Sequence, residues 1–439
     1  MISTMRLKTN EMNNILEIPS SLLLKTGITS GEKTILRFGS KSCPVTVLPS
    51  RRSEGTLSKN CVDELHFPAQ MQINLKVGDD ELVIGPYVGI LASLKEKNLP
   101  ARLKSWLNIL QYTSHNDGII LVFSAEGINR EQLCINGHIY DSEEKKWKSG
   151  VFPYPDSIYK RMGLNRNLLN HLKDQTGNKI FNETSLSKWK VYQYLSMEES
   201  LKPYLPSTNI YKSPQDVIEL TDTFQSVFLK PTLGSYGKNT YQISPKDPSL
   251  YIIKHREKGE NHEDILHASE LKEYLTHHLG RKKYIVQQGL NITFRDDKVI
   301  DYRLYLSKDA SGEWRCTGWI AKAGVPNSIV SNHSNGGSVE NAEKMLQECL
   351  GGDAERAEAA KQRAYSIACK AAACLEKNSG RQFGYFGVDL AIDAHGQLWI
   401  IEMNHRYVDD KLPLSIGDRA LYEKIQTSYL SCLRFLSGF

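Results

Sequence analysis

The chain has 439 residues, of which 40% are hydrophobic and 24% are charged, and its formal net charge is +5. This composition is typical of a soluble globular protein of two or three domains, and it argues against a membrane protein and against a strongly basic nucleic-acid binder. The mild positive charge favours anionic small ligands.

The N-terminal segment MISTMRLKTN has no apolar core of the kind found in secretory signals. The eight cysteines are scattered and show no spacing typical of a metal site. We therefore expect reduced thiols in a cytoplasmic protein.

Residues 1–85 are rich in predicted strands and carry a weak internal repeat. Residues 15–39 are echoed by residues 64–85, because each segment predicts a strand, a proline, a short apolar stretch, a glycine-containing turn and a second strand. Duplicated units of this size commonly close a small barrel, and the pattern resembles double-psi or swapped-hairpin barrels. Two unrelated strand-turn-strand units would give the same pattern.

Residues 86–180 predict a small α/β domain. Apolar strands at 87–91 and 119–123 flank a helical segment at 100–112, which indicates parallel strands. A hairpin-like pair follows at 133–140 and 146–152. Four residues after it are candidates for lining a cleft: Asp156, Tyr159, Lys160 and Arg161.

Residues 181–439 carry the sharper signals, beginning with a predicted helix at 185–196. The strand 226–230 ends in Lys230 and leads into PTLGSYGKN, where two glycines flank Ser235 before Lys238. A glycine-rich turn lets backbone N–H groups face an anion. We name this turn the glycine flap, although a simple hairpin turn would have the same sequence features.

Two further strands carry charged residues. The strand 301–306 alternates so that Asp301, Arg303 and Tyr305 share one face, where an arginine fork would suit phosphate oxygens. The strand 314–323 carries Lys322 and is followed by Asn332 before a second glycine turn. A helical region with a solvated charged face is predicted at 341–377, broken at 351–353, and a final helix at 418–436.

A β-hairpin is predicted at residues 384–404, GYFGVDLAIDAHGQLWIIEMN. A turn at 393–396 would place Asp389 opposite Glu402, and Asn404 shares a face with Glu402. Three oxygen-bearing side chains then converge on an apolar hairpin, and oxygen ligands favour Mg²⁺ or Mn²⁺. Polar strand ends that face solvent would explain the same residues equally well.

In combination, these motifs resemble an ATP-grasp domain. They are the lysine of SKWK, the lysine ending VFLK, the GSYGKN flap, the strand exit QQG, the DYR strand, an N-x-x-x-G-G turn and the Asp…Glu-x-Asn trio. The segments FPYPDSIY, NKIFN, SKWK, LKPTLGSYGKN, SNHSNGG and GVDLAID…IIEMN are similar to the YheC/YheD-like branch, described as endospore coat-associated.

The resemblance implies an α+β / α/β architecture. Residues 181–439 would form an ATP-grasp fold, in which two α+β subdomains clamp a nucleotide. A small α/β pre-ATP-grasp domain at 86–180 and the barrel-like domain at 1–85 would precede it.

The resemblance also implies roles for the matching residues. Nucleotide contacts would come from Lys188, Lys230, Gly234, Ser235, Gly237, Lys238, Gln287, Gln288 and Leu290. Mg²⁺ or Mn²⁺ would be held by Asp389, Glu402 and Asn404, and the catalytic residues would be Arg303, Lys322 and Asn332. Two positions depart from the usual pattern: Gln288-Gly289 replaces an acidic ribose contact, and Lys322 stands where relatives often have arginine.

The expected function is an ATP- and Mg²⁺-dependent ligase. It would join a carboxylate substrate to an amine through an acyl phosphate, with no nucleic-acid or membrane partner and with an association with the spore coat. Two alternatives are open at this point: a small-molecule kinase that uses the same nucleotide site, and a non-catalytic ATP-binding component of the spore surface.

Overall fold

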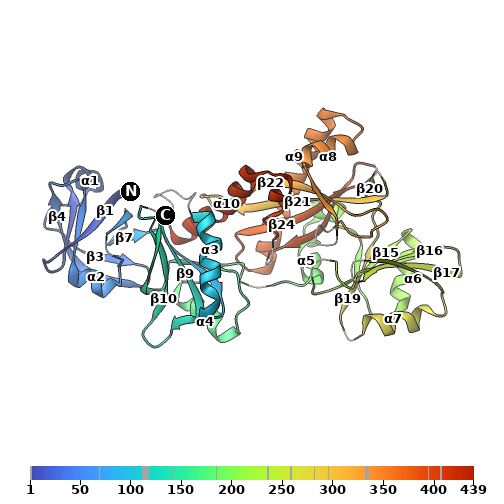
Figure 1. The fold of residues 1–439 in the computed structure, drawn as a ribbon, viewed down its shortest axis with the longest axis horizontal. Coiled ribbons are helices and arrows are strands. Elements are labelled where there is room, and N and C mark those ends of the chain that lie inside the picture. The colour runs from blue at the N-terminus through green and yellow to red at the C-terminus, as the bar shows by residue number, and fades with distance from the viewer. Residues whose placement is uncertain are drawn as a thin grey trace.

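The computed structural model describes residues 2–68, 70–110, 118–141, 143–183, 185–234, 237–257, 260–280, 282–294, 296–331, 336–393, 395–405 and 408–439. The molecule is elongated, and its four sheets follow one another along the long axis (Figure 1). The chain starts in the barrel at one end, passes through the second sheet, reaches the third sheet at the far end and returns to form the fourth sheet in between.

The N-terminal sheet is a closed barrel with the strand order β1-β5-β2-β4-β3-β7-β6, which confirms the predicted barrel. Its strands are β1 (Ile2–Asn10), β2 (Ile15–Pro19), β3 (Lys33–Phe38), β4 (Lys41–Ser50), β5 (Gly55–Ser58), β6 (Met71–Val77) and β7 (Glu81–Gly85), with helices α1 (Ser20–Thr26) and α2 (Lys59–Leu65).

The predicted register of the internal repeat is wrong. Residues 64–65, where a strand was expected, end α2, because Cys61 and Leu65 are one helical turn apart and both are buried. The repeat in the structure instead relates the series β2-α1-β3-β4 to the series β5-α2-β6-β7, because both have the order strand, helix, strand, strand.

The second sheet has the order β11-β10-β9-β8-β12-β13 and mixes parallel and antiparallel pairs. Strand β8 pairs parallel with both β9 and β12, which confirms the predicted parallel strands. The elements are β8 (Tyr87–Ser93), β9 (Ile119–Asn129), β10 (Cys134–Asp141), β11 (Lys146–Pro153), β12 (Ser157–Lys160), β13 (Ile180–Phe181), α3 (Leu99–Leu110) and α4 (Arg166–Gln175).

The third sheet has the order β14-β19-β15-β16-β17-β18, and one of its faces packs against two helices. The elements are β14 (Thr208–Ile210), β15 (Val227–Pro231), β16 (Tyr241–Pro245), β17 (Leu250–Glu257), β18 (Glu260–His267), β19 (Tyr284–Gln288), α6 (Pro214–Thr223) and α7 (Leu271–Leu279). Helix α5 (Lys188–Leu195) precedes this sheet in the chain.

The fourth sheet has the order β23-β22-β21-β24-β25, and β20 pairs with β21. Its elements are β20 (Thr293–Phe294), β21 (Lys298–Lys308), β22 (Trp314–Ala323), β23 (Ser338–Glu340), β24 (Tyr385–Ile392), β25 (Leu398–Asn404), α8 (Ala342–Cys349), α9 (Ala354–Ser379) and α10 (Arg419–Ser437). The predicted hairpin, the break between the two helices and the final helix are confirmed.

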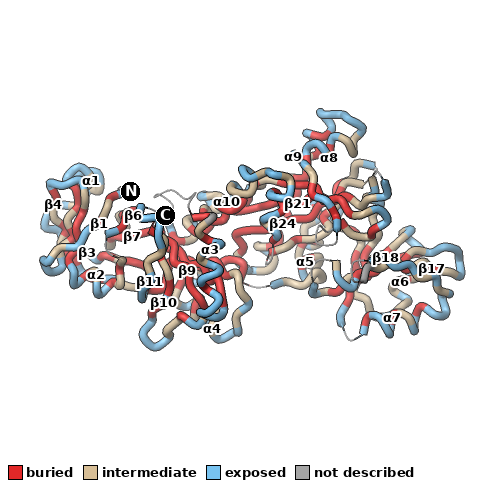
Figure 2. The backbone as a smooth tube through the Cα atoms, in the orientation of Figure 1, coloured by how far each residue is buried: buried red, intermediate tan, exposed pale blue. Residues whose placement is uncertain are grey.

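Alternation along β21 assigns the two faces of the fourth sheet. Leu304 and Leu306 pack in one core with α9, whereas Tyr305 packs in another core with α10. Helices α9 and α10 therefore cover opposite faces, and Figure 2 shows β21 and β24 as largely buried. Asp301 and Arg303 share the face of Tyr305, as predicted from the strand period.

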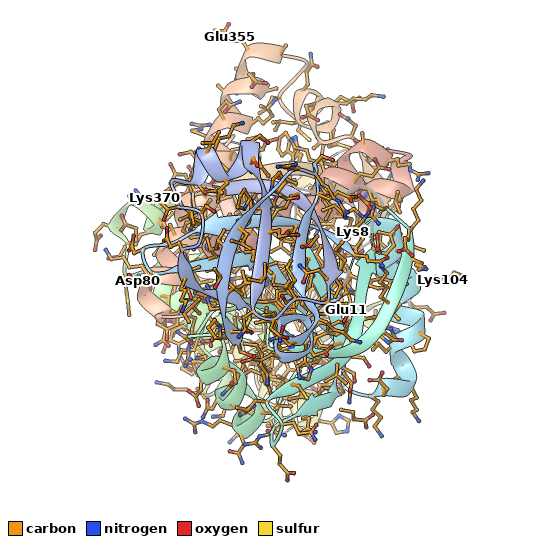
Figure 3. All side chains as sticks on the ribbon, turned by 90° about the vertical axis from the view of Figure 1, so that its left-hand side faces the viewer. Lys8, Glu11, Asp80, Lys104, Glu355 and Lys370 are labelled. Carbon is orange, nitrogen blue, oxygen red and sulfur yellow. The ribbon has the colours of Figure 1, made fainter. Side chains whose placement is uncertain are left out.

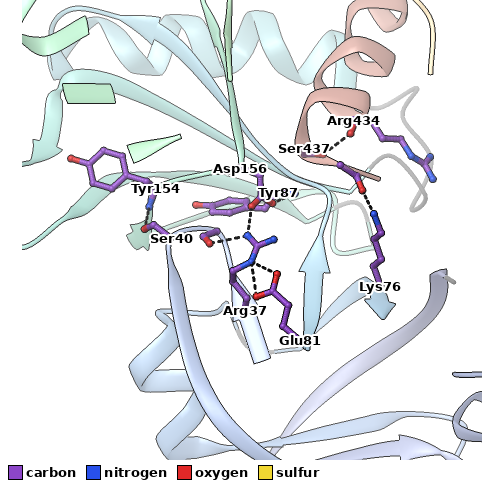
Figure 4. Close-up of polar contacts among 11 residues, drawn as sticks. Arg37, Ser40, Lys76, Glu81, Tyr87, Tyr154, Asp156, Arg434 and Ser437 are labelled. Carbon is purple, nitrogen blue, oxygen red and sulfur yellow. Dashed lines mark hydrogen bonds and ion pairs between the residues drawn. The ribbon is translucent and has the colours of Figure 1, made fainter. Parts of the chain in front are cut away.

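Polar contacts attach the barrel to the second sheet (Figure 4). The Arg37 guanidinium donates to Asp156 Oδ1 at 2.7 Å and to Glu81 Oε1 at 3.0 Å. Burial raises the pKa of Asp156, and Arg37 opposes that effect. Asp156, predicted as a cleft candidate, instead joins two parts of the fold. The C-terminal end of the chain adds a contact, because Lys76 Nζ donates to the Gly438 carbonyl oxygen.

Charged side chains of both signs cover the surface. In Figure 3 the labelled residues of the barrel, α3 and α9 point outward, and all six are exposed: Lys8, Glu11, Asp80, Lys104, Glu355 and Lys370. This confirms the predicted solvated face of the helical region. All eight cysteines are free thiols, and no helix in the described residues combines the length and the apolar character that a membrane crossing requires.

Replacement of Arg37 by alanine should destabilise the fold by about 2–3 kcal/mol, because it leaves the buried Asp156 carboxylate without its charged partner. Urea unfolding measures the change. The control is Lys8→Ala, which removes a more exposed pair with Glu54 and should cost less than about 0.5 kcal/mol. Equal costs for the two variants would contradict this account of the contact.

Candidate functional site

A row of charged residues crosses four neighbouring strands of the fourth sheet. In the strand register, Lys322 on β22 lies opposite Asp301 on β21, and Arg303 on β21 lies opposite Asp389 on β24. Asp389 in turn lies opposite Glu402 on β25, as the hairpin predicts. Cross-strand neighbours are close enough to interact directly, so the pairing brings distant segments of sequence to one place.

Asp389 is the centre of this row and is only 5% exposed. The Arg303 fork donates to it twice, from Nε at 2.6 Å and from Nη2 at 3.0 Å, and Lys322 Nζ lies 3.1 Å from its Oδ1. Burial would raise the pKa of the Asp389 carboxyl, but Arg303 and Lys322 outweigh burial and hold the pKa below its usual range. Asp389 is therefore a fixed, ionised carboxylate.

Asp301 is a second buried carboxylate beside the first. Lys322 Nζ lies 2.9 Å from Asp301 Oδ1, and the Ser331 hydroxyl donates to Oδ2 at 2.6 Å. Burial raises the pKa of Asp301, and the negative charge of Asp389 adds to that effect. Lys322 thus bridges two carboxylates.

Two backbone features make room for this arrangement. A Cβ atom at Gly387 would lie 3.0 Å from Arg303 Cδ and 2.7 Å from Val408 Cγ1, so a glycine there lets the arginine cross β24. The register of β24 and β25 shifts between Asp389 and Leu390, which leaves Ile401 as an extra residue next to Glu402. Such bulges redirect side chains near functional sites.

Glu402 and Asn404 complete the hairpin's polar face. Lys188, the first residue of α5, forms an ion pair with Glu402, and its backbone N–H donates to the Thr232 carbonyl. The Asn404 amide donates to Asp389 Oδ2 at 3.1 Å. The three predicted metal ligands are therefore neighbours.

The third sheet faces this row with a polar surface. Val227 and Leu229 of β15 pack under α6 and α7, so Phe228 and Lys230 point the other way, toward the fourth sheet. Lys230 Nζ donates to Gln287 Oε1 at 2.7 Å, and Gln287 Nε2 donates to Thr208 at 2.9 Å.

The Lys230 ammonium is strongly perturbed by its surroundings. Burial, followed by the nearby charge of Lys188, lowers the pKa of Lys230 to about 8. A lysine with this pKa changes between its charged and neutral forms near physiological pH.

A cavity of about 410 Å³ lies between the two sheets. Most of the predicted site residues line it: Lys188, Lys230, Gly234, Gly237, Lys238, Gln287, Gln288, Leu290, Asp389 and Glu402. Arg303, Lys322 and Asn404 do not line it and contact Asp389 instead. Ser235 and Asn332 lie outside the described residues.

Sequence reasoning missed several residues of this cavity. Gln242 and Lys254 lie opposite each other on β16 and β17, and both line it together with Asp301 and Ser331. The two-residue strand period already places Asp301 on the same face as Arg303, and this pattern could have predicted that Asp301 belongs to the site. Lys254 carried no signal of its own, because its position depends on the pairing of β17 with β16.

Gln288, Gly289 and Leu290 follow the third sheet at the end of β19 and are called the hinge here, and Gly289 is required there by the space available. A Cβ atom there would lie 1.9 Å from Ser226 Oγ, and the Gly289 N–H donates to the Ser226 carbonyl at 2.7 Å. An acidic side chain at position 289 would not fit, because the backbone at Gly289 lies against the backbone at Ser226.

The donor set fits Mg²⁺. Asp389, Glu402 and Asn404 offer only oxygen ligands, and Mg²⁺ is usually bound by one or two carboxylates together with substrate phosphates, without a cage of protein ligands. No cluster of three or more His, Cys, Asp or Glu side chains suited to a metal occurs in the described parts of the chain. A metal at Asp389 would share that carboxylate with Arg303 and Lys322.

Known proteins are similar to this chain in sequence. The YheC/D-like ATP-grasp family model matches residues 177–436. The endospore coat-associated protein YheD of Bacillus subtilis (strain 168) is 31% identical over 91% of this chain and 88% of its own length. YheC of the same organism is 21% identical over 65% of this chain and 79% of its own length.

Among solved structures, the D-cycloserine synthetase DcsG aligns over 79% of this chain and 99% of its own, with a TM-score of 0.44 and 13% sequence identity. The family assignment depends on the family model and on YheD. Because the family model covers more than half of the sequence, this chain belongs to the YheC/D-like ATP-grasp family.

Proposed function

We propose that this protein is an ATP- and Mg²⁺-dependent ligase that joins a carboxylate to an amine. The observation that carries the proposal is the cavity between the third and fourth sheets, where lysines and flap glycines face Asp389 and Glu402. Family membership supports the use of ATP.

Each wall of the cavity suits one part of a nucleotide. Lys188, Lys230 and Lys238 provide positive charge for the phosphates, and the flap glycines bring backbone N–H groups near them. Gln287, Gln288 and Leu290 would contact the adenine. Asp389, Glu402 and Asn404 would hold Mg²⁺, which supplies charge neutralisation at the β- and γ-phosphates when it is bound.

The proposed reaction has two steps. A carboxylate oxygen of the substrate attacks the γ-phosphorus and the bond to the β,γ-bridging oxygen breaks, which gives an acyl phosphate and ADP. The amine then attacks the acyl carbon, phosphate leaves, and the nitrogen loses a proton to give the amide. The protein acts through positioning and electrostatics, as phosphoryl transfer generally requires.

Arg303 and Lys322 hold Asp389 through the contacts described above. The two cations and the neutral residue Asn332 remain the predicted catalytic residues. The contacts of Arg303 and Lys322 fix the orientation of the Asp389 carboxylate before any ligand arrives. Contact of Arg303 with a phosphate oxygen would use part of the fork that now binds Asp389.

The names of two relatives support a proposal about where in the cell this protein acts. YheD and YheC are named as endospore coat-associated. We accordingly propose that this chain associates with the spore coat, and a cytoplasmic location stays the prediction made from its cysteines.

The change Glu402→Gln should slow ADP release about 100-fold or more, because it removes a carboxylate that faces the nucleotide phosphates and the metal. ADP release is measured with amino acids, short peptides and acidic polymers as substrates. Glu355→Gln makes the same chemical change on the exposed surface of α9 and should leave the rate unchanged. Unchanged turnover in Glu402→Gln would overturn the assignment.

The products of the same assay separate a ligase from a kinase. A ligase releases free phosphate together with ADP and forms an amide, whereas a kinase leaves the phosphoryl group on the acceptor. Recovery of a phosphorylated product in place of free phosphate would replace the ligase proposal with the kinase alternative.

Nucleotide affinity should fall as the pH rises from about 7 to about 9. Lys230 is protonated below its pKa of about 8 and neutral above it, and only the protonated form attracts phosphate. Calorimetry with a non-hydrolysable ATP analogue measures this, and affinity should decrease by up to about tenfold per pH unit above 8. Lys230→Arg keeps its charge and should show a flat profile, and a flat profile in the unmodified protein would contradict the prediction.

A further inference from the structure

A second cavity of about 470 Å³ adjoins the proposed nucleotide cavity. One face of α5 forms part of its wall, because Lys188, Val191, Tyr192 and Leu195 recur at helical spacing. The rest of the wall comes from residues 185–186, from β14 and the segment before it, from β15 and the segment after it, from β19, and from β25 with His405. Its volume is within the roughly 300–1,000 Å³ of small-molecule sites.

The two cavities meet at charged residues. Lys188, Lys230 and Glu402 line both, together with Pro206, Gly234, Gln287 and Ile401. The flap lysine Lys238 and the hinge residues Gln288 and Leu290 line only the first cavity. A nucleotide that contacts the flap and the hinge therefore leaves the second cavity available.

Away from this junction the wall of the second cavity is mostly aliphatic, with polar side chains at Ser185, Thr208, Thr232, Asn404 and His405. Val191, Leu195, Ile400 and Met403 belong to the core beneath the fourth sheet, and Leu205 and Ile285 extend the same surface. Burial of alkyl groups against such a wall is favourable. At the junction, Lys188 and Lys230 bring two cations against the one carboxylate of Glu402, which pairs with Lys188, so the balance attracts negative charge. The surface thus matches a ligand with an apolar body and an anionic head.

We propose that the second cavity binds an apolar carboxylate, with its head group toward Lys188 and Lys230 and its body between α5 and β25. The proposal goes beyond the ligase assignment, since binding needs no turnover. Such a ligand would contact the same lysines as the nucleotide, so occupancy of one cavity should change affinity for the other.

Alkyl carboxylates of increasing length are suitable probes for calorimetry on the full chain. Octanoate should bind more tightly than hexanoate, and hexanoate more tightly than butyrate, by up to about fourfold per methylene. Octylamine has the same body and the opposite charge, and it should bind about tenfold or more weakly than octanoate. Equal binding of the two, or no saturable binding of octanoate, would overturn the proposal.

Leu205 allows a matched pair of variants, because it lines only the second cavity and is half-buried. Leu205→Asp places a charge in the apolar wall and should weaken octanoate binding about tenfold or more, whereas Leu205→Met keeps the wall and should bind like the unmodified protein. The affinity for an ATP analogue alone should be unchanged in both, which shows that the fold is intact. If Leu205→Asp does not fold, Val191→Phe, which fills the cavity, should give the same loss; undiminished octanoate binding in the folded variant would refute the site.

Two uses of the same site are distinguished by adding ATP and an amine. A carboxylate that stimulates ADP release and is consumed is a substrate, whereas one that changes nucleotide affinity without ADP release is an effector. Both results support the site. If no carboxylate stimulates ADP release but octanoate still binds, the ligase proposal fails and the second site remains.

Discussion

The site depends on the ionised, buried carboxylate of Asp389. A carboxylate that is 5% exposed is stable only when hydrogen-bond donors and cations surround it, and here the Arg303 fork, the Lys322 ammonium and the neutral Asn404 amide do so. These partners come from β21, β22 and β25, so the correct pairing of the strands and the charge of the site require one another. Removal of Arg303 or Lys322 would leave the buried carboxylate with one cation in place of two.

The position of the cavity follows from strand alternation in the two sheets that border it. The third sheet directs Val227 and Leu229 into its own core and Phe228 and Lys230 outward. On the fourth sheet, Tyr305 packs under α10 while Asp301, on the same strand face, lines the cavity. Two ordinary amphipathic sheets thus produce a polar cavity with cations on one side and carboxylates on the other, which is the arrangement an ATP-grasp chain needs for a charged nucleotide.

Local patterns in the sequence were enough to predict the hairpin, the Asp389–Glu402 pair and the shared face of Asp301 and Arg303, because each follows from the two-residue strand period and a nearby turn. Contacts between distant segments could not be predicted in this way. The pairing that brings Lys322 and Arg303 to Asp389 joins positions 67 and 86 residues apart, and periodicity carries no information about it. The repeat register in the barrel failed for a related reason: Leu65 is apolar in either a strand or a helix, and only packing with Cys61 decides between them.

The central claim is that Mg·ATP binds against the hairpin of β24 and β25. Isothermal titration calorimetry with a non-hydrolysable ATP analogue, with Mg²⁺ and then with a chelator, tests this claim most directly. The account predicts saturable binding that requires Mg²⁺ and that is lost when Asp389 is changed to asparagine in a variant that still unfolds cooperatively. Binding of equal strength without Mg²⁺, or no binding at all, would contradict it and would favour a structural role for the protein.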